Sequence, residues 1–334
     1  MKIPHHAAAD GCVLVTGCAG FIGSNVTEML LSQGRRVVGV DNMNDAYDPR
    51  LKEWRLKKLL RHPGLDFHRV DLTRAPDLRG VFEKASPFAS VIHLAARAGV
   101  RQSVENPWAY VETNLTGTLN LLELCRHRDV KKLVLASTSS LYGGTNTVPF
   151  REDGDTNSPL SPYAASKKAA EAFCYTYHAL YGLDVTVVRY FTVYGPAGRP
   201  DMSLFRFVQR ISERWPITVF GDGHQSRDFT HVDDIARGTC AALRPLGFEV
   251  VNLGSDRPVV LSDAIGMIES LVGEKAKIER QALHPADVAT TWADVGKARR
   301  LLDWRPEMHF REGLSGLVNW YRENRSWASE LVTQ

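Results

Sequence analysis

The chain of 334 residues is 44% hydrophobic and 24% charged, a balance that allows a chain of this length to bury a large apolar core. Its 41 basic and 38 acidic residues leave a formal net charge of only +3, which argues against general nucleic-acid binding and makes any anion site local. No apolar stretch approaches the ~20 residues that span a bilayer, and residues 1–11 lack the core of a secretory signal. We therefore expect no membrane insertion.

The cysteines and histidines indicate neither a disulfide framework nor a metal site. The five cysteines are an odd number without a CxxC pair, and the eleven histidines lack the spacing of metal ligands. This pattern is typical of a protein in a reducing cytoplasm. The cysteines are Cys12, Cys18, Cys125, Cys174 and Cys240.

From residue 12 to about 190, short β-branched runs alternate with longer helical patterns. Parallel neighbouring strands need such crossover connections, so the alternation predicts an α/β fold with a doubly wound parallel sheet, covered by helices on both faces. The predicted strands are 13–16, 36–40, 66–70, 91–94, 133–136 and 185–189.

A turn-rich segment at 195–200 separates this region from a C-terminal third of mixed strands and helices. We predict a dinucleotide-binding domain at 1–194 and a smaller α/β substrate lobe at 195–334, packed against the carboxyl ends of the first sheet, with some chain crossover between them. The lobe's predicted strands are 217–220, 250–253 and 277–280, and its predicted helices lie near 232–243, 261–272 and 311–323.

Three further helical segments are predicted. Residues 105–127 and 161–181 carry apolar stripes, and this periodicity alone does not separate core from interface. The charge run at 50–61 reads as a solvated helix face with i,i+4 ion pairs.

The segment TGCAGFIG at residues 16–23 places glycines between an apolar strand and an amphipathic helix. Gly17, Gly20 and Gly23 permit a tight turn, close approach of a pyrophosphate and close helix–sheet packing. Asp41 ends the second predicted strand, where a carboxylate accepts both ribose hydroxyls and repels a 2′-phosphate. The pattern therefore favours NAD over NADP as cofactor. Asp71 ends the third strand, and it either binds the adenine amino group or caps a helix.

A second motif, YAASK at 163–167, puts the phenol of Tyr163 and the ammonium of Lys167 on one helix face. Tyrosine titrates at about 10, so it becomes a useful base only where positive charge lowers its pKa. Lys167 and an oxidised nicotinamide could supply that charge. Thr138 ends the fifth predicted strand and points into the same crevice at the carboxyl edge of the sheet. We predict these three residues as catalytic, and we expect His93 to cap the crevice.

These motifs carry a resemblance to the extended short-chain dehydrogenase/reductase superfamily of NAD-dependent nucleotide-sugar epimerases and dehydratases, which has a Rossmann fold. The shared segments are TGCAGFIG, HLAA at 93–96, STSSLYG at 137–143, YAASK and RDFTHVDD at 227–234. Within the superfamily the chain resembles most the UDP-glucuronate 4-epimerase branch. The segments that carry this finer likeness are DNMN at 41–44, AGVR at 98–101, RYFTVYGP at 189–196 and GRPDM at 198–202.

The resemblance implies further site residues and a homodimer that joins the helices 105–127 and 161–181. The additional NAD-binding residues that it implies are Phe21, Ile22, Asn42, Leu72, Leu94, Ala95, Ala96, Asn114, Ser137 and Phe191. The residues implied at the UDP-sugar are Arg101, Ser139, Ser140, Thr192, Arg199, Thr218, Val219, Phe220, Arg227 and Asp287, besides Thr138 and Tyr163.

The residues after Thr138 bear on the reaction. Related 4,6-dehydratases carry an Asp-Glu pair there, and UDP-glucuronate decarboxylases carry a glutamate at the position of Ser140; this chain has Ser139 and Ser140. Hydroxyls do not replace a carboxylate as base near neutral pH, so the likeness favours 4-epimerisation through a 4-keto sugar. Thr192 favours a uronate, since epimerases of neutral UDP-hexoses usually have asparagine there.

Three alternatives stay open at this point. The first is 4-epimerisation of UDP-glucose and UDP-galactose, or of their N-acetylhexosamine counterparts, which the same Tyr163 and Lys167 would serve. The second is UDP-glucuronate decarboxylation, and the third is a sensor that binds NAD without catalysis.

Overall fold

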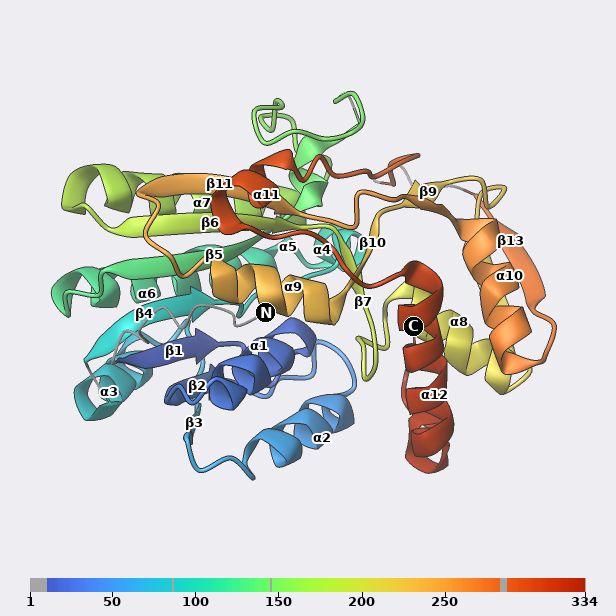
Figure 1. Cartoon of the computed structure of the whole chain (residues 1–334), viewed down its shortest axis with the longest axis horizontal. Coiled ribbons are helices and arrows are strands. Elements are labelled where there is room, and N and C mark those ends of the chain that lie inside the picture. Colours follow the sequence, from blue (N-terminus) through green and yellow to red (C-terminus); the bar gives the residue numbers. More distant parts are fainter. Residues whose placement is uncertain (1–10, 86, 145, 283–286, 334) are drawn as a thin grey trace, which may run out of the picture.

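The computed structural model describes residues 11–85, 87–144, 146–282 and 287–333; the first ten residues of the segment searched for a secretory signal lie outside these ranges. Within them, seven parallel strands form the main sheet in the order β11-β6-β5-β4-β1-β2-β3 (Figure 1). The predicted doubly wound α/β fold is confirmed. The strands are β1 (Cys12–Thr16), β2 (Val37–Asp41), β3 (Leu65–Arg69), β4 (Phe88–His93), β5 (Lys132–Thr138), β6 (Asp184–Tyr190) and β11 (Phe248–Leu253).

Helices cover both faces of this sheet because successive strand residues point to opposite sides. Val13 and Val15 of β1 pack with α1 (Phe21–Ser32), α9 (Val232–Ala241) and α11 (Gly296–Leu302). Leu14 packs on the other side, with α3 (Ala75–Ala85), α6 (Gly117–His127) and α7 (Pro162–Tyr181). The two apolar clusters hold the carboxyl edge of the sheet rigid.

The helix predicted at 105–127 is interrupted. α4 (Val100–Glu105) ends at Asn106, whose φ of −137° and ψ of 77° are not helical. Pro107 then starts α5 (Pro107–Tyr110), a π-helical turn η1 (Val111–Thr116) follows, and α6 continues to His127. Pro107 lacks the N–H that would continue α4, which explains the break.

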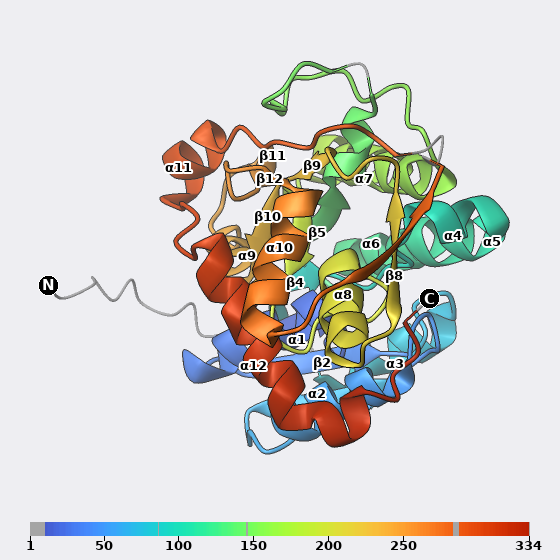
Figure 2. The ribbon, with the colours of Figure 1, turned by 90° about the vertical axis from the view of Figure 1, so that its right-hand side faces the viewer.

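The smaller lobe packs beside the carboxyl ends of the strands, and in Figure 2 its helices lie in front of the sheet. It is built from α8 (Ser203–Ser212), α10 (Leu261–Val272), α12 (Phe310–Ala328) and the parallel pair β8 (Pro216–Phe220) and β13 (Lys277–Gln281). Two further two-stranded ladders pair β7 (Thr192–Tyr194) with β10 (Phe229–His231) and β9 (Ser226–Arg227) with β12 (Val259–Val260).

One strand lies elsewhere than predicted. The sequence predicts the run 250–253 as a strand of the smaller lobe, but it belongs to β11, which pairs in parallel with β6 at the edge of the main sheet. A strand here covers the backbone groups that β6 would otherwise expose. The chain therefore crosses from the lobe back to the sheet between β10 and β11.

The interpretation of the charge run 50–61 as a solvated face is wrong for two of its cations. Lys52 and Arg55 lie on the inner face of α2 (Pro49–Leu59), where they are only 5% and 3% exposed. Leu51 joins the core of the smaller lobe, and Trp54 stacks against Trp327 with ring centroids 6.4 Å apart. Thus α2 follows the second strand in the chain and yet packs against the lobe.

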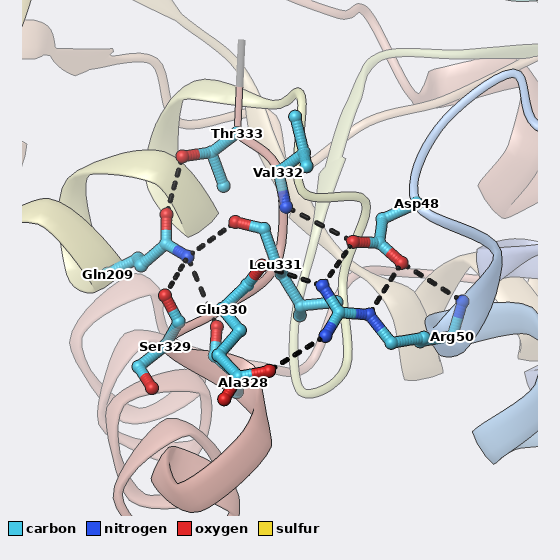
Figure 3. A network of polar contacts seen from close by, with 9 residues as sticks. All are labelled: Asp48, Arg50, Gln209, Ala328, Ser329, Glu330, Leu331, Val332 and Thr333. Atoms are coloured by element: carbon cyan, nitrogen blue, oxygen red, sulfur yellow. Dashed lines mark hydrogen bonds and ion pairs between the residues drawn. The ribbon is translucent and has the colours of Figure 1, made fainter.

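The C-terminal residues fasten α2 to α8 (Figure 3). The backbone N–H of Val332 donates to Asp48 over 3.2 Å, and Arg50 donates to the carbonyl of Glu330 over 2.6 Å. The fully buried amide of Gln209 on α8 donates to the carbonyls of Ala328, Ser329 and Leu331. Buried carbonyls are thereby paired, and the two helices keep a fixed relative position.

No helix in the described part of the chain is long and apolar enough to cross a membrane.

Candidate active site

A cavity of about 410 Å³ opens between the carboxyl ends of the strands and the smaller lobe. It lies where the strand order reverses between β1 and β4, the place where open α/β sheets bind ligands. It brings together most of the site residues predicted from the sequence. Those lining it are Gly17, Gly20, Phe21, Ile22, Gly23, Asp41, Asn42, Asp71, Leu72, Leu94, Ala95, Ala96, Ser137, Thr138, Ser139, Ser140, Tyr163, Lys167, Phe191, Thr192, Arg199, Arg227 and Asp287.

The glycine loop has the shape of a pyrophosphate cradle. Gly17 has a φ of +73°, and a Cβ there would lie 2.7 Å from the N–H nitrogen of Ala95. A Cβ at Gly23 would lie 1.9 Å from the carbonyl oxygen of Gly17, so α1 contacts the loop without a side chain between them. Gly20 caps α1 without a side-chain hydrogen bond, and the first turn holds no acidic residue. The free N–H groups at this end fit a dinucleotide pyrophosphate.

The predicted ribose carboxylate, Asp41, is held at the cavity edge. It accepts from the N–H of Ala19 over 3.2 Å and from that of Met43 over 2.8 Å, and the Lys52 ammonium lies 3.5 Å away. The contact with Ala19 places Asp41 beside the glycine loop. The arrangement fits an adenosine ribose beside Asp41.

Asp71 lies at the neighbouring strand end and accepts from Asn42 over 2.7 Å and from the hydroxyl of Thr73 over 2.8 Å. Its partial burial alone would raise the pKa, but these hydrogen bonds outweigh it and hold the pKa of Asp71 below its ordinary value. Asp71 both lines the cavity and closes a turn with Thr73, and it does not cap α3, which begins at Ala75. The helix-capping alternative for this residue is therefore wrong.

His93 is a buried link between two elements. Its Nδ1 lies 2.7 Å from the hydroxyl of Thr16, and its Nε2 lies 2.9 Å from that of Thr118. Burial, assisted by the positive charge of Lys167, lowers the pKa of His93 to about 3. A neutral ring at this place ties the end of β1 to α6 and does not act as an acid or a base.

Tyr163 and Lys167 lie on the inner face of α7, whose start is capped by Ser161. Burial raises the pKa of the Tyr163 phenol above its ordinary value, while a hydrogen bond with Thr138 and the positive charge of Arg199 act in the opposite direction. Burial lowers the pKa of the Lys167 ammonium to about 8. Both groups are thus poised for proton chemistry, and a further positive charge beside Tyr163 would favour its phenolate.

The predicted hydroxyl groups gather beside Tyr163. The hydroxyl of Thr138 accepts from the N–H of Ser140 over 3.1 Å and lies 3.1 Å from the Ser140 hydroxyl. Ser139 begins the short 3₁₀ turn that follows β5, and Thr192 reaches the same cavity from β7. This end of the site therefore offers hydroxyl donors from two strands.

Arg199 lines the cavity with part of its guanidinium already engaged. Its Nε donates to Asp201 over 3.1 Å, and its Nη2 donates to the carbonyl of Ala98 over 3.2 Å. The pairing with Asp201 orients the guanidinium and reduces its net charge toward a ligand. Arg199 therefore presents a fixed donor face to the cavity near Tyr163.

The far end of the site carries two arginines around one carboxylate. Arg101 donates to Asp287 over 2.6 Å, and its guanidinium lies 3.6 Å from the ring centroid of Phe220. Burial lowers the pKa of Arg227, the negative charge of Asp287 opposes this shift, and the charge of Arg101 adds to it. Arg227 lines the cavity and the charge of Arg101 lies near it, so this end of the site is electropositive and fits an anionic ligand.

Five predicted residues do not line the cavity: Arg101, Asn114, Thr218, Val219 and Phe220. Asn114 turns inward from the π-helical turn, where its amide donates to the carbonyl of Arg97 and to the hydroxyl of Ser166, each over 2.9 Å. Val219 packs into the lobe core with an exposed fraction of 2%, because alternate residues of β8 face inward. Its side chain is therefore unavailable to a ligand.

The described ranges bring no three His, Cys, Asp or Glu side chains together as metal ligands. Other cavity residues were missed from the sequence, above all Tyr47, Lys52 and Met202. One signal in the sequence could have indicated that Lys52 is buried. Lys52 and Arg55 have the helical spacing that puts them on the same face of α2 as the apolar Leu51.

The family model described as the NAD dependent epimerase/dehydratase family matches residues 13–254. The chain belongs to this family. Its cofactor is NAD, in agreement with the glycine loop and Asp41.

A curated relative, UDP-glucuronate 4-epimerase from Thermodesulfobacterium geofontis, is 58% identical over 315 residues, which is 94% of this chain and 97% of that protein. The crystal structure of UDP-glucuronic acid 4-epimerase from Bacillus cereus with UDP-glucuronic acid and NAD has a TM-score of 0.88 and 37% identity, and the match covers 94% of this chain and 99% of that one. A UDP-glucose 4-epimerase from Thermotoga maritima with UDP-glucose has a TM-score of 0.87 at 31% identity, over 94% and 99% of the two chains.

The lowered pKa of Lys167 predicts a pH dependence of stability. Below pH 8 the buried ammonium destabilises the folded cofactor-free protein, and the penalty disappears as the pH rises toward the ordinary lysine value of 10.5. Relative to Lys167→Met, the free energy of unfolding of the wild type should rise by up to about 3 kcal/mol across this window. Denaturant titrations at several pH values measure it. Lys57→Met, at an exposed position of α2, is the control. A difference in free energy of unfolding between the wild type and Lys167→Met that does not change with pH would contradict the burial of this charge.

Proposed function

We propose that this chain is a UDP-glucuronate 4-epimerase, which interconverts UDP-glucuronate and UDP-galacturonate with NAD as cofactor. The observation that carries the proposal is the group of hydroxyls from Thr138, Ser139, Ser140 and Thr192 beside Tyr163, where an elimination enzyme would need carboxylates. The 58% identity with a UDP-glucuronate 4-epimerase supports the same substrate.

In the proposed reaction the phenolate of Tyr163 takes the proton of the C4 hydroxyl and becomes the phenol, and Thr138, its hydrogen-bond partner, keeps the Tyr163 oxygen directed at that group. The glycine loop and Asp41 would hold NAD, which would supply a reversible acceptor for the C4 hydride and a positive charge that favours the Tyr163 phenolate. The 4-keto sugar then rotates in the cavity so that the opposite face of C4 receives the hydride, and Tyr163 gives the proton back to the C4 oxygen. No atom is gained or lost, so the product differs only in configuration.

The uronate carboxylate needs restraint during this reaction. A 4-keto uronate is a β-keto acid, and it loses carbon dioxide when the carboxylate turns perpendicular to the plane of the carbonyl. Ser139, Ser140 and Thr192 would fix the carboxylate by hydrogen bonds that also offset its desolvation. The oriented guanidinium of Arg199 would add a charged donor.

The nucleotide half of the substrate would bind at the other end of the cavity. Arg227, which lines the cavity, would pair with the diphosphate, and the nearby charge of Arg101 would add to the attraction. Asp287 would then face the ribose of uridine. The uracil would extend beyond the cavity toward β8, where Thr218 and Phe220 are half-buried and Val219 contributes only backbone groups.

Substrate assays test the proposal directly. Purified protein incubated with UDP-glucuronate should yield UDP-galacturonate, resolved by NMR, and incubation with UDP-glucose should yield far less product. Tyr163→Phe should lower the rate at least about a hundredfold while bound NAD remains, because it removes only the proton acceptor. Turnover of UDP-glucose alone would overturn the proposal, and UDP-xylose as main product would identify a decarboxylase.

The hydroxyl restraint predicts a change of product in Thr192→Ala. NAD content should stay at the wild-type level, while the fraction of decarboxylated pentose product should rise about tenfold or more, since one lost hydrogen bond to a charged group weakens restraint by at least about 1.5 kcal/mol. Separation of the nucleotide sugars by anion exchange measures the ratio. Thr176→Ala, at an exposed position of α7, is the matched control. An unchanged ratio in Thr192→Ala would remove Thr192 from the carboxylate site.

We propose in addition that the chain forms a homodimer in the cytoplasm. Val104, Trp108 and Val111 are exposed apolar residues of the neighbouring elements α4, α5 and η1, with Trp108 74% exposed, and exposed apolar surface favours association. The five cysteines are free thiols, which supports a reducing compartment.

Sedimentation measurements test the dimer. The wild type should sediment with the mass of two chains, and Trp108→Glu should shift it toward one chain because a charge in an apolar interface is poorly solvated. Trp215→Glu changes an exposed tryptophan of the smaller lobe and should leave the mass unchanged. A wild-type monomer would refute the dimer.

A further inference from the structure

Arg55 is the buried cation of α2 that the reaction described above does not use. Its Nε and Nη2 donate to the carbonyl of Ala197 over 3.1 and 2.6 Å, and Nη2 also donates to the carbonyl of Gly198 over 3.1 Å. Its Nη1 donates to the hydroxyl of Tyr47 over 2.8 Å and to the carbonyl of Ala19 over 3.4 Å. One guanidinium thus joins the glycine loop to the turn at 195–200.

The partners of Arg55 indicate a purpose other than charge neutralisation. In the part of the chain that the structure describes, its N–H groups meet only carbonyl and hydroxyl oxygens, although the side chain is 3% exposed. Burying a guanidinium without a carboxylate is costly unless every donor is used. The fork of Arg55 satisfies this condition through a geometry that lysine lacks.

The turn that Arg55 holds has an unfavourable backbone. Ala197 has a φ of +50°, in the left-handed region that a residue with a Cβ rarely adopts, and Gly195 has a φ of +150°. Such conformations persist only where surrounding contacts fix them. The paired N–H groups of Arg55 on the Ala197 carbonyl are such contacts.

The same turn carries Arg199 into the cavity. The guanidinium carbon of Arg199 lies 5.7 Å from the ring centroid of Tyr47, and that of Arg55 lies 5.6 Å from the same ring. Tyr47 is therefore flanked by both cations. Because α2 is fastened at its first turn by the C-terminal residues (Figure 3), Arg55 projects from a fixed support.

We propose that Arg55 is a positioning residue for the substrate, which holds the turn at 195–200 in its strained form and so keeps Arg199 directed at the sugar. Arg55 itself does not line the cavity. The inference rests on the proposed function, in which Arg199 contacts the sugar carboxylate. It goes beyond that function because the position of Arg199 at the sugar carboxylate depends on Arg55, a residue of α2 in the predicted dinucleotide-binding domain.

Steady-state kinetics of the NAD-loaded enzyme test this. Arg55→Lys should raise KM for UDP-glucuronate about tenfold and leave kcat within about threefold, because one lysine donor replaces a bidentate fork remote from the reacting atoms. NAD content should not change. In an Arg199→Lys background, Arg55→Lys should raise KM by less than about twofold, since both changes remove the same contact. Additive effects on KM, or an unchanged KM, would overturn the proposal.

Hydrogen exchange of the backbone amides separates this inference from the proposed function. Arg55→Lys should speed exchange in residues 195–200 whatever the substrate, and Lys57→Met on the exposed face of α2 should not. Unchanged exchange in this turn would refute the positioning role, whereas failure of the wild type to convert UDP-glucuronate would refute the proposed function. If Arg55→Lys does not fold, Arg55→Gln carries the test, because its single amide group removes the paired donors to the Ala197 carbonyl while keeping a polar side chain; unchanged exchange there would equally refute the role.

Discussion

The close approach of α1 to the end of β1 is the contact on which the site depends. Gly23 lies so near the carbonyl of Gly17 that no Cβ fits between them, and this proximity directs the free N–H groups of α1 into the cavity. The main chain must lie close to an anion to hold it by its own dipoles. The loop at Ala95, the carboxylate of Asp41 and the imidazole of His93 are all arranged around this point.

The groups around the sugar end are tuned mainly by burial. Burial raises the pKa of Tyr163 and lowers that of Lys167, so each group is shifted toward its neutral form. The charge of Arg199 and the hydroxyl of Thr138 oppose this shift at the phenol. A site of this kind becomes active only when a ligand supplies the missing charge, which couples proton transfer to the presence of the cofactor.

The fate of a 4-keto sugar depends on which groups surround it. Carboxylates beside C5 would act as bases, whereas the hydroxyls of Ser139, Ser140 and Thr192 donate and accept hydrogen bonds without taking a proton near neutral pH. In the proposed function, restraint of the substrate carboxylate is then a matter of geometry, in which Arg55, from outside the cavity, supports the arrangement of Arg199 and Tyr47 inside it.

The amino-acid sequence alone was enough for the features that local spacing encodes. These features depend on residues only a few positions apart, where backbone periodicity determines which side chains share a face of a helix or strand. They are the alternation of strands and helices, the glycines at 17, 20 and 23, and the pair Tyr163 and Lys167. Contacts between distant segments were decided by the tertiary structure. Arg55 meets the carbonyl of Ala197 across 142 positions, and Arg101 meets Asp287 across 186. A charged helix pattern looks the same whether it faces water or a second lobe, because only the folded chain brings the carbonyls that make burial of the charge favourable.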